Sequence, residues 1–186
     1  MTGPGRAVRV RAARPEEWPA IGELTARVYR TGGFTPAGHP YLATLRDAAA
    51  RAGVGELLLA EESGRLLGSV TLVIGTAPFA DPAAGPDGAT LRMLVVDPAG
   101  RRAGVGAALV RDCIDRARRR GARVIWLSTE PEMHAARRLY QRLGFARTPE
   151  HDWTPIPGVR LLTYALRVDP APRSADYSTR AIRSPS

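Results

Sequence analysis

The chain has 186 residues, a length that suits one domain with a buried core. Its apolar fraction of 44% and charged fraction of 24% are ordinary for a globular protein, and we find no apolar run long enough for a signal peptide or a membrane span. With one cysteine, Cys113, we expect no internal disulfide, no metal site and a cytoplasmic location. We expect Cys113 to belong to the core, because it falls on the apolar face of a predicted helix.

The net charge of +9 raises the question of nucleic-acid binding. All 27 basic residues are arginines, and they are scattered apart from Arg118–Arg120, where a predicted helix ends and cations complement its dipole. Nucleic-acid recognition requires clustered basic and aromatic side chains, which this sequence does not show. We therefore expect no nucleic-acid and no membrane partner, but a field that favours an anionic small ligand.

The first half of the chain predicts a strand, two helices and a β-hairpin. Apolar and arginine residues alternate near the start, and Arg14-Pro15-Glu16-Glu17 has the early proline and the acids of a helix start. Glu62-Ser63-Gly64 separates two apolar runs and predicts a hairpin turn. The expected elements are a strand over 7–13, helices over 14–29 and 41–52, and strands over 56–60 and 65–74.

The second half predicts a parallel β-α-β unit followed by a helix and two further strands. A long amphipathic helix lies between two apolar strands, which makes a right-handed parallel connection the expected one. The expected elements are strands over 89–96, 124–127, 145–148 and 159–168, and helices over 104–120 and 131–143. We expect one α/β domain over residues 7–168, a flexible N-terminus over 1–6 and a disordered tail over 169–186.

The turn between strand 89–96 and the next helix carries the most functional information. The strand ends before Pro98, and the basic turn Arg101-x-x-Gly104-x-Gly106 leads into the helix. In this order, backbone N–H groups converge on one small volume, the helix dipole adds positive charge, and glycines let a phosphate approach. We call residues 101–106 the cradle and expect it to bind a phosphate group.

Two common phosphate-binding motifs do not fit the cradle. A dinucleotide-binding turn requires G-x-G-x-x-G, and here the third glycine is missing. A nucleotide-triphosphate P-loop requires a lysine, and this chain has none.

A third motif does fit. Val95-Val96-Asp97-Pro98-x-x-Arg101-x-x-Gly104-x-Gly106-x-x-Leu109 resembles the acyl-CoA-binding motif of the GCN5-related N-acetyltransferase (GNAT) family, and Ala136-x-x-Leu139-Tyr140-x-x-Leu143-Gly144-Phe145 resembles that family's second signature. The resemblance covers roughly residues 7–168. It implies a GNAT-like α/β domain with a mixed central sheet of about six to seven strands, splayed near the middle and flanked by about four helices.

The resemblance further implies an acetyl-CoA-dependent N-acetyltransferase in which the amine of a small molecule or a protein attacks the thioester directly. The pantetheine arm would bond to free backbone groups of the splayed strand, and cradle N–H groups would bind the pyrophosphate. Tyr140 would protonate the leaving thiolate, because a phenol of pKa about 10 is protonated at neutral pH. Dimers are frequent in the family, so a homodimer is compatible with this interpretation. The implied donor-binding residues are Leu94, Val95, Val96, Arg101, Arg102, Ala103, Gly104, Val105 and Gly106.

Three positions depart from the family pattern. Arg102 stands where a glycine is common, Met133 where an asparagine is frequent, and Ser128 where many members carry a glutamate base. No general base is assigned from the sequence. The other candidates are Glu130, Glu132, His134, Glu150, His151 and Asp152.

Three loops, residues 32–41, 76–88 and 150–158, are expected to surround the acceptor, because loops carry much of the variable function on a fold. Glu150 and Asp152 could attract a cationic amine. The alternative function is a non-catalytic acyl-CoA-binding or regulatory module, which Met133 and the missing base favour. The aromatic side chains of the three loops are Phe34, His39, Tyr41, Phe79 and Trp153.

Overall fold

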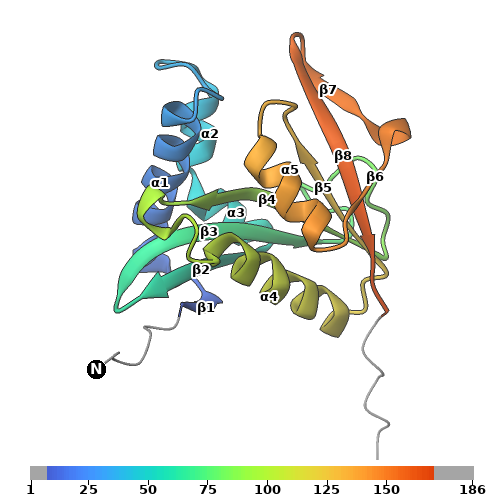
Figure 1. Ribbon diagram of the computed structural model, residues 1–186, viewed down its shortest axis with the longest axis horizontal. Coiled ribbons are helices and arrows are strands. Elements are labelled where there is room, and N and C mark those ends of the chain that lie inside the picture. The colour runs from blue at the N-terminus through green and yellow to red at the C-terminus, as the bar shows by residue number, and fades with distance from the viewer. Residues whose placement is uncertain (1–7, 170–186) are drawn as a thin grey trace, which may run out of the picture.

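The computed structural model describes residues 8–169, so the expected flexible N-terminus and all but the first residue of the expected tail lie outside the described residues. Within residues 8–169, eight strands pair in the order β1-β2-β3-β4-β5-β8-β6, and β7 pairs with β8 (Figure 1). The strands are β1 (Arg9–Ala12), β2 (Glu56–Glu62), β3 (Arg65–Ile74), β4 (Gly88–Val96), β5 (Val124–Thr129), β6 (Ala146–Arg147), β7 (Trp153–Ile156) and β8 (Val159–Arg167). The helices are α1 (Trp18–Thr31), α2 (Tyr41–Arg46), α3 (Ala48–Val54), α4 (Val105–Arg119) and α5 (His134–Arg142).

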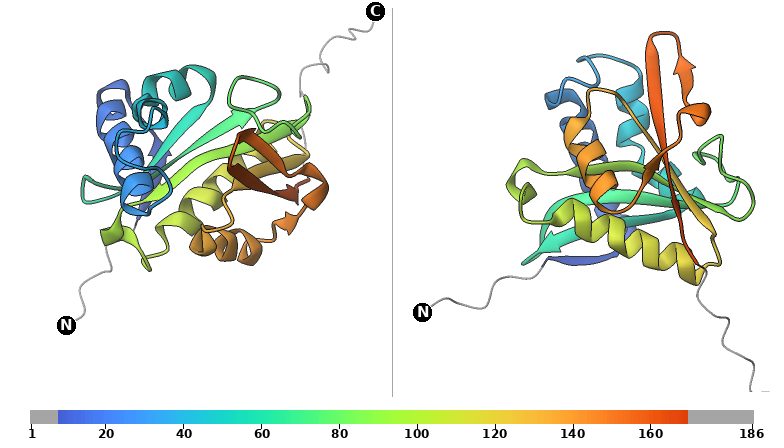
Figure 2. Two further views of the ribbon diagram at one scale, coloured as in Figure 1. Left: turned by 90° about the horizontal axis from the view of Figure 1, so that it is seen from above. Right: turned by 45° about the vertical axis from the view of Figure 1, so that its right-hand side comes forward.

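Helices cover both faces of the sheet, as Figure 2 shows: α1, α2 and α3 lie on one face, and α4 and α5 on the other. The main core lies between the sheet and the pair α4 and α5, where Leu109, Cys113 and Ile125 are fully buried. A smaller cluster lies between α1 and α3 and strand β2 on the opposite face. The prediction that Cys113 belongs to the core is therefore confirmed.

The sheet is splayed between β4 and β5. Their parallel ladder runs from Gly88 opposite Val124 to Leu91 opposite Leu127, and then ends. Beyond this point β4 continues along β3 to Val96, and β5 continues along β8 to Thr129. Met93, with a φ of 53°, lies where the register between β3 and β4 shifts, so a bulge turns β4 away from β5. We call this opening between residues 92–96 and residues 128–129 the fork. The prediction of a splayed mixed sheet is confirmed.

The structure differs from the predicted elements in three places. The helix predicted over 131–143 begins only at His134, because residues 131–132 form a turn. The helix predicted over 41–52 is two helices, because the backbone turns at Asp47, whose carboxylate accepts the N–H of Ala50 (2.8 Å) and caps α3. The loop expected over 150–158 contains β7, an edge strand that pairs with β8, so the sheet has eight strands rather than six or seven. Its Pro155 is tolerated because an edge strand leaves one row of backbone groups unpaired.

Candidate active site

The cradle is held in place by contacts on both of its sides. Asp97, directly after β4, accepts the N–H of Ala99 (2.9 Å) and pairs with Arg27 of α1 (2.8 Å). Its own N–H donates to the carbonyl of Leu67 in β3 (2.8 Å). Gly100 is buried, and a Cβ there would lie 3.2 Å from the same carbonyl. The cradle therefore begins from a backbone position fixed by α1 and β3.

Backbone N–H groups gather at the cradle without protein acceptors. The first hydrogen bond of α4 runs from Ala108 N–H to the Gly104 carbonyl (2.9 Å). Within residues 8–169, no acceptor takes the N–H groups of residue 102 or of residues 104–107. Free N–H groups at a helix N-terminus bind anions, and the helix dipole adds to their attraction. Arg101 and Arg102 are exposed beside them and add positive charge.

The residues of the cradle have different structural roles. Gly104 precedes α4 with a φ of 77°, and a Cβ there would meet no atom within 4 Å, so this position requires a left-handed backbone rather than space. Arg102 also has a left-handed φ of 65°, which explains why a glycine is common at this position. For a residue with a Cβ, this backbone conformation costs roughly 1 kcal/mol. Gly106 is different, because a Cβ there would lie 3.1 Å from Leu139 of α5. It lets α4 and α5 approach closely.

The fork leads directly to the cradle. In the described part of the chain no strand pairs with residues 92–96 on the β5 side, because the ladder between β4 and β5 ends at Leu91. Val95 is buried, while Leu94 and Val96 are partly buried and pack against the main core. One edge of β4 is thus open for an extended ligand, and it ends at the unpaired N–H groups of the cradle. All nine predicted donor-binding residues lie along this continuous path of backbone, although the side chains of Val95 and Val105 are buried in the core.

Tyr140 comes from α5 on the same face as α4. Its side chain is 6% exposed and packs beside Phe145 and Tyr164, with ring centroids 5.9 and 6.4 Å away. No described residue hydrogen-bonds to its hydroxyl group. Burial raises the pKa of Tyr140 above its ordinary value, so the hydroxyl remains a proton donor at neutral pH. Burial also raises the pKa of the nearby Cys113, which therefore is a thiol and not a thiolate nucleophile.

Tyr29 of α1 belongs to the opposite side of the fork, and the sequence analysis did not identify it. Its ring is edge-on to those of Phe34 (6.3 Å) and Tyr41 (6.4 Å). Burial raises the pKa of Tyr29, as do its electrostatic interactions with Tyr41 and Tyr140. Two tyrosines therefore approach the fork from opposite faces of the sheet. Tyr29 lay on a predicted amphipathic helix, where an aromatic residue has no signal that separates it from the core.

Two charged residues near Tyr29 complete this side of the fork. Arg92 of β4 and Glu130, directly after β5, both affect the pKa of Tyr29, and both are partly buried. Neither forms an ion pair within residues 8–169. Burial raises the pKa of Glu130, and repulsion by Glu132 adds to this shift. The candidates Glu132, His134, Glu150 and His151 are exposed.

Asp152, expected from the sequence as an acid that could attract a cationic amine, is paired with two arginines in the structure. Its side chain is 9% exposed and pairs with Arg147 (2.5 Å) and Arg160 (3.1 Å), and it accepts the N–H of Thr163 (2.9 Å). Its charge is therefore already compensated, and it joins the start of β7 to β8. Burial opposes ionisation, but these hydrogen bonds outweigh it and hold the pKa of Asp152 below its ordinary value.

We expect Asp152→Asn to lower the free energy of unfolding by about 2 kcal/mol at neutral pH, because the partly buried guanidinium group of Arg147 and the exposed one of Arg160 lose the anion that they share. A depressed pKa in the folded state contributes stability above the unfolded pKa, near 3.8, and this contribution is lost as the pH falls through the folded value. Urea unfolding at pH 7 and pH 3 measures the difference in the free energy of unfolding between wild type and variant. This difference should be smaller at pH 3 than at pH 7. A difference that is equal at both pH values would contradict the assignment.

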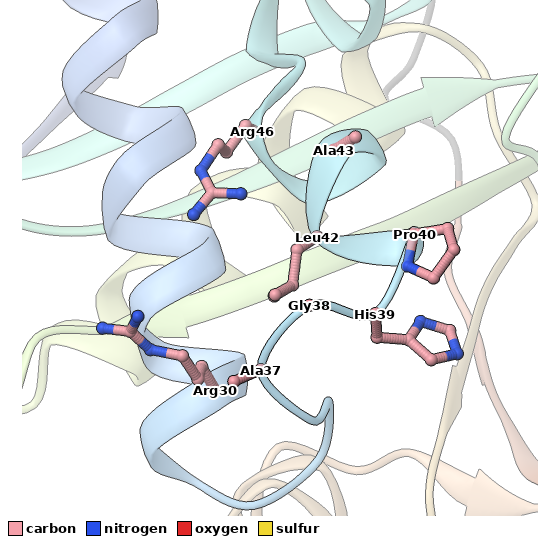
Figure 3. Close-up of a pocket in the computed structure, with 8 residues that line it drawn as sticks. All are labelled: Arg30, Ala37, Gly38, His39, Pro40, Leu42, Ala43 and Arg46. Atoms are coloured by element: carbon pink, nitrogen blue, oxygen red, sulfur yellow. The ribbon is translucent and has the colours of Figure 1, made fainter.

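A separate surface pocket of about 440 Å³ lies between α1 and α2 (Figure 3). Arg30 and Arg46 flank it, and His39 lies at its edge, where its Nδ1 accepts the N–H of Tyr41 (3.1 Å). No residue of the cradle or of the fork lines this pocket. His39, expected near the acceptor, thus contributes to a different concavity. Within residues 8–169 no three His, Cys, Asp or Glu side chains gather as a metal site, and no helix is long and apolar enough to cross a membrane.

The forked α/β sheet and the cradle at its end place the chain in a known family. Residues 18–145 match the model of the acetyltransferase (GNAT) family, and the chain belongs to this family.

Relatives with assigned names and solved structures agree with this membership. Mycothiol acetyltransferase of Cellulomonas flavigena is 35% identical over 153 residues, which are 78% of this chain and 42% of that protein. The chain spans about two fifths of the length of the curated relatives it matches. A GCN5-related N-acetyltransferase from Kribbella flavida is 30% identical, with a TM-score of 0.64 over 87% of this chain and 98% of that one. A Salmonella typhimurium structure with acetyl-CoA is 24% identical, with a TM-score of 0.64 over 88% and 95%.

Proposed function

We propose that this protein transfers an acetyl group from acetyl-CoA to a primary amine of a small molecule or a peptide. The observation that carries the proposal is the open edge of β4, which ends at the unpaired N–H groups of residue 102 and residues 104–107. That surface suits an extended ligand with a pyrophosphate at one end. The Salmonella typhimurium structure solved with acetyl-CoA and the acetyltransferase names of the relatives support the same donor.

In this proposal each part of acetyl-CoA has a partner. The pyrophosphate binds to the cradle N–H groups, and the exposed guanidinium groups of Arg101 and Arg102 add charge. The pantetheine arm lies along residues 94–96 and bonds to their free backbone groups as an added strand would. The thioester then lies in the fork, between Tyr140 on one face of the sheet and Tyr29 on the other.

The chemistry follows from this placement. The amine attacks the thioester carbonyl directly, a tetrahedral intermediate forms, and its collapse expels the CoA thiolate. Tyr140 donates its proton to that thiolate. Its burial favours this role, because it keeps the hydroxyl protonated and excludes water from the leaving group.

The acceptor is expected on the side of α1 and β7. Figure 1 shows the α1–α2 loop and the β7–β8 hairpin on either side of the fork. Aromatic side chains come from both, with Tyr41 on one side and Trp153 on the other, and Trp126 of β5 packs edge-on against His151 (4.9 Å). Arg92 and Glu130 supply charges of both signs between them.

A second candidate function, a non-catalytic acyl-CoA-binding module, has one observation in its favour. Met133 replaces a frequent asparagine, and its sulfur only accepts the hydroxyl of Thr129 (3.3 Å), so it offers no donor to a ligand. Such a module would bind acetyl-CoA and release no CoA when amines are added.

A thermal-shift titration followed by an amine panel tests the proposal. Saturating acetyl-CoA should raise the melting temperature, because the ligand binds the folded state. A panel of small amines, amino acids, aminoglycosides and peptides should then contain at least one acceptor that releases free CoA thiol. No thermal shift would contradict the donor site, whereas a shift without amine-dependent thiol release would favour the binding module.

A further inference from the structure

A buried carboxylate lies next to the fork, and the acetyl transfer described above gives it no role. Asp81, in the loop between β3 and β4, is 2% exposed, and no cation lies within 4.0 Å of it in the described part of the chain. Its backbone N–H donates to Thr90 of β4 (2.9 Å), and its Oδ1 accepts the N–H of Ala83 (3.0 Å). These bonds fix the carboxylate against β4 and leave Oδ2 directed to β5.

Ser128 is the group that Asp81 contacts. It is the first residue of β5 beyond the last β4–β5 pair, so it lies where the fork begins. Its hydroxyl donates to Oδ2 of Asp81 (2.5 Å), and its oxygen accepts the indole N–H of Trp153 (3.0 Å). Ser128 therefore connects a buried carboxylate to the opening where the thioester is proposed to lie.

The hydrogen bonds leave Ser128 able to accept one more proton donor. The nearby Thr163 hydroxyl (3.2 Å) donates to the carbonyl of His151 (2.8 Å), so its hydrogen is not available to Ser128. A hydroxyl oxygen has two lone pairs, and Trp153 occupies one of them. The second lone pair is free for a ligand N–H.

If Asp81 served only to hold the loop in place, burying its carboxylate would cost free energy of folding without need. Burying an ionised carboxyl group without a cation is unfavourable, and a neutral amide could make the bond to Ala83 equally well. A carboxylate that is hydrogen-bonded to a hydroxyl group facing the ligand has the geometry required of a group that accepts a proton during a reaction.

We propose that Asp81 is the terminal proton acceptor of the reaction and acts through Ser128; this inference rests on the acetyltransferase function proposed above. The acceptor enters as its ammonium ion, and one N–H proton passes to Oγ of Ser128 while the Ser128 hydroxyl proton passes to Oδ2 of Asp81, which frees the nitrogen lone pair. This lone pair forms the new bond to the acetyl carbon, and the carbon–sulfur bond breaks with its electron pair on sulfur. Tyr140 protonates that sulfur, the nitrogen loses its second proton to water, and exchange with water restores Tyr140 and Asp81.

The first test is Asp81→Asn, compared with Asp87→Asn as a control in the same loop, whose side chain is exposed. At neutral pH, Asp81→Asn should lower kcat/KM for the amine about 100-fold, in the range typical of general base catalysis, with little change in KM for acetyl-CoA. The loss should shrink as the pH approaches the pKa of the amine, because the amine then loses its proton to solvent. Asp87→Asn should have the wild-type pH profile.

Two further variants keep the result interpretable. Ser128→Ala should show the same loss of activity at neutral pH as Asp81→Asn and the same recovery at high pH. Asp81→Asn and Ser128→Ala should both retain the melting-temperature increase with acetyl-CoA. The other ionisable side chains on this side of the fork are Arg92 on β4, Glu130 after β5 and His151 before β7. Glu130→Gln should lower the rate at neutral pH less than Asp81→Asn does, and its loss should not shrink at high pH.

Three results would overturn the inference. These are a wild-type rate for Asp81→Asn at neutral pH, a loss that is the same at every pH, and a pH-dependent loss that appears in Glu130→Gln instead. The proposed function has a separate outcome, because it fails only if wild type itself acetylates no amine.

Discussion

Tyr140→Phe is expected to lower kcat about 100-fold while the affinity for acetyl-CoA changes little, because the variant loses only a proton donor. The hydroxyl of Tyr140 has no partner within residues 8–169, so its removal leaves no buried group unsatisfied. The ring keeps its contacts with Phe145 and Tyr164. Steady-state kinetics with the active amine, together with a thermal-shift titration of acetyl-CoA, measure both quantities.

Tyr164→Phe is the matched control. Tyr164 is fully buried with its ring 6.4 Å from Tyr140, but its hydroxyl accepts a hydrogen bond from Arg137 (3.2 Å). The same chemical change there should affect stability and leave kcat near the wild-type value. If Tyr140→Phe also retained wild-type turnover, Tyr140 would not be the acid of the reaction.

Gly104→Val is expected to weaken acetyl-CoA binding at least tenfold, a loss of about 1.4 kcal/mol or more. Valine strains the left-handed backbone at the start of α4 and turns the free N–H groups of the cradle away from their common focus. Isothermal titration calorimetry with acetyl-CoA measures the affinity. Because the strained residue also destabilises the fold, a control variant with equal backbone strain is needed to separate the loss of binding from the loss of stability.

Gly121→Val supplies that control at the other end of the same helix. Gly121 has a φ of 81°, and a Cβ there would meet no atom within 4 Å, as at Gly104. Both variants should lower the free energy of unfolding by roughly 1–2 kcal/mol, the cost of a left-handed backbone for a residue with a Cβ. Only Gly104→Val should lose acetyl-CoA affinity. Equal affinities in the two variants would show that the cradle does not bind the donor.

The donor side of the site could be predicted from the sequence because its information is local. The cradle and the open edge of β4 are contiguous in the chain, and the groups proposed to bind the donor are backbone groups whose positions depend on glycine spacing. The splay of β4 and β5 follows from the same resemblance. Arg102, which departs from the family pattern, has the left-handed backbone that explains the usual glycine.

The acceptor side could not be predicted in the same way because it is assembled from distant segments. The bond between Asp81 and Ser128 joins residues 47 positions apart, and no periodicity or spacing indicates it. Asp152 looked like a free acid in a loop, whereas the fold pairs it with Arg147 and Arg160. β7 was missed because Pro155 within it and Pro157 directly after it are typical of a loop, and only pairing with β8 makes it a strand.

The central claim is that an amine takes the acetyl group from acetyl-CoA bound along β4 and the cradle. The most direct measurement incubates the wild-type protein with acetyl-CoA and the active amine, and quantifies free CoA and acetylated amine by mass spectrometry. The predicted result is one acetylated amine for each CoA released, with no release when the amine is omitted. CoA release that is independent of the amine, or no release with any amine although acetyl-CoA raises the melting temperature, would contradict it.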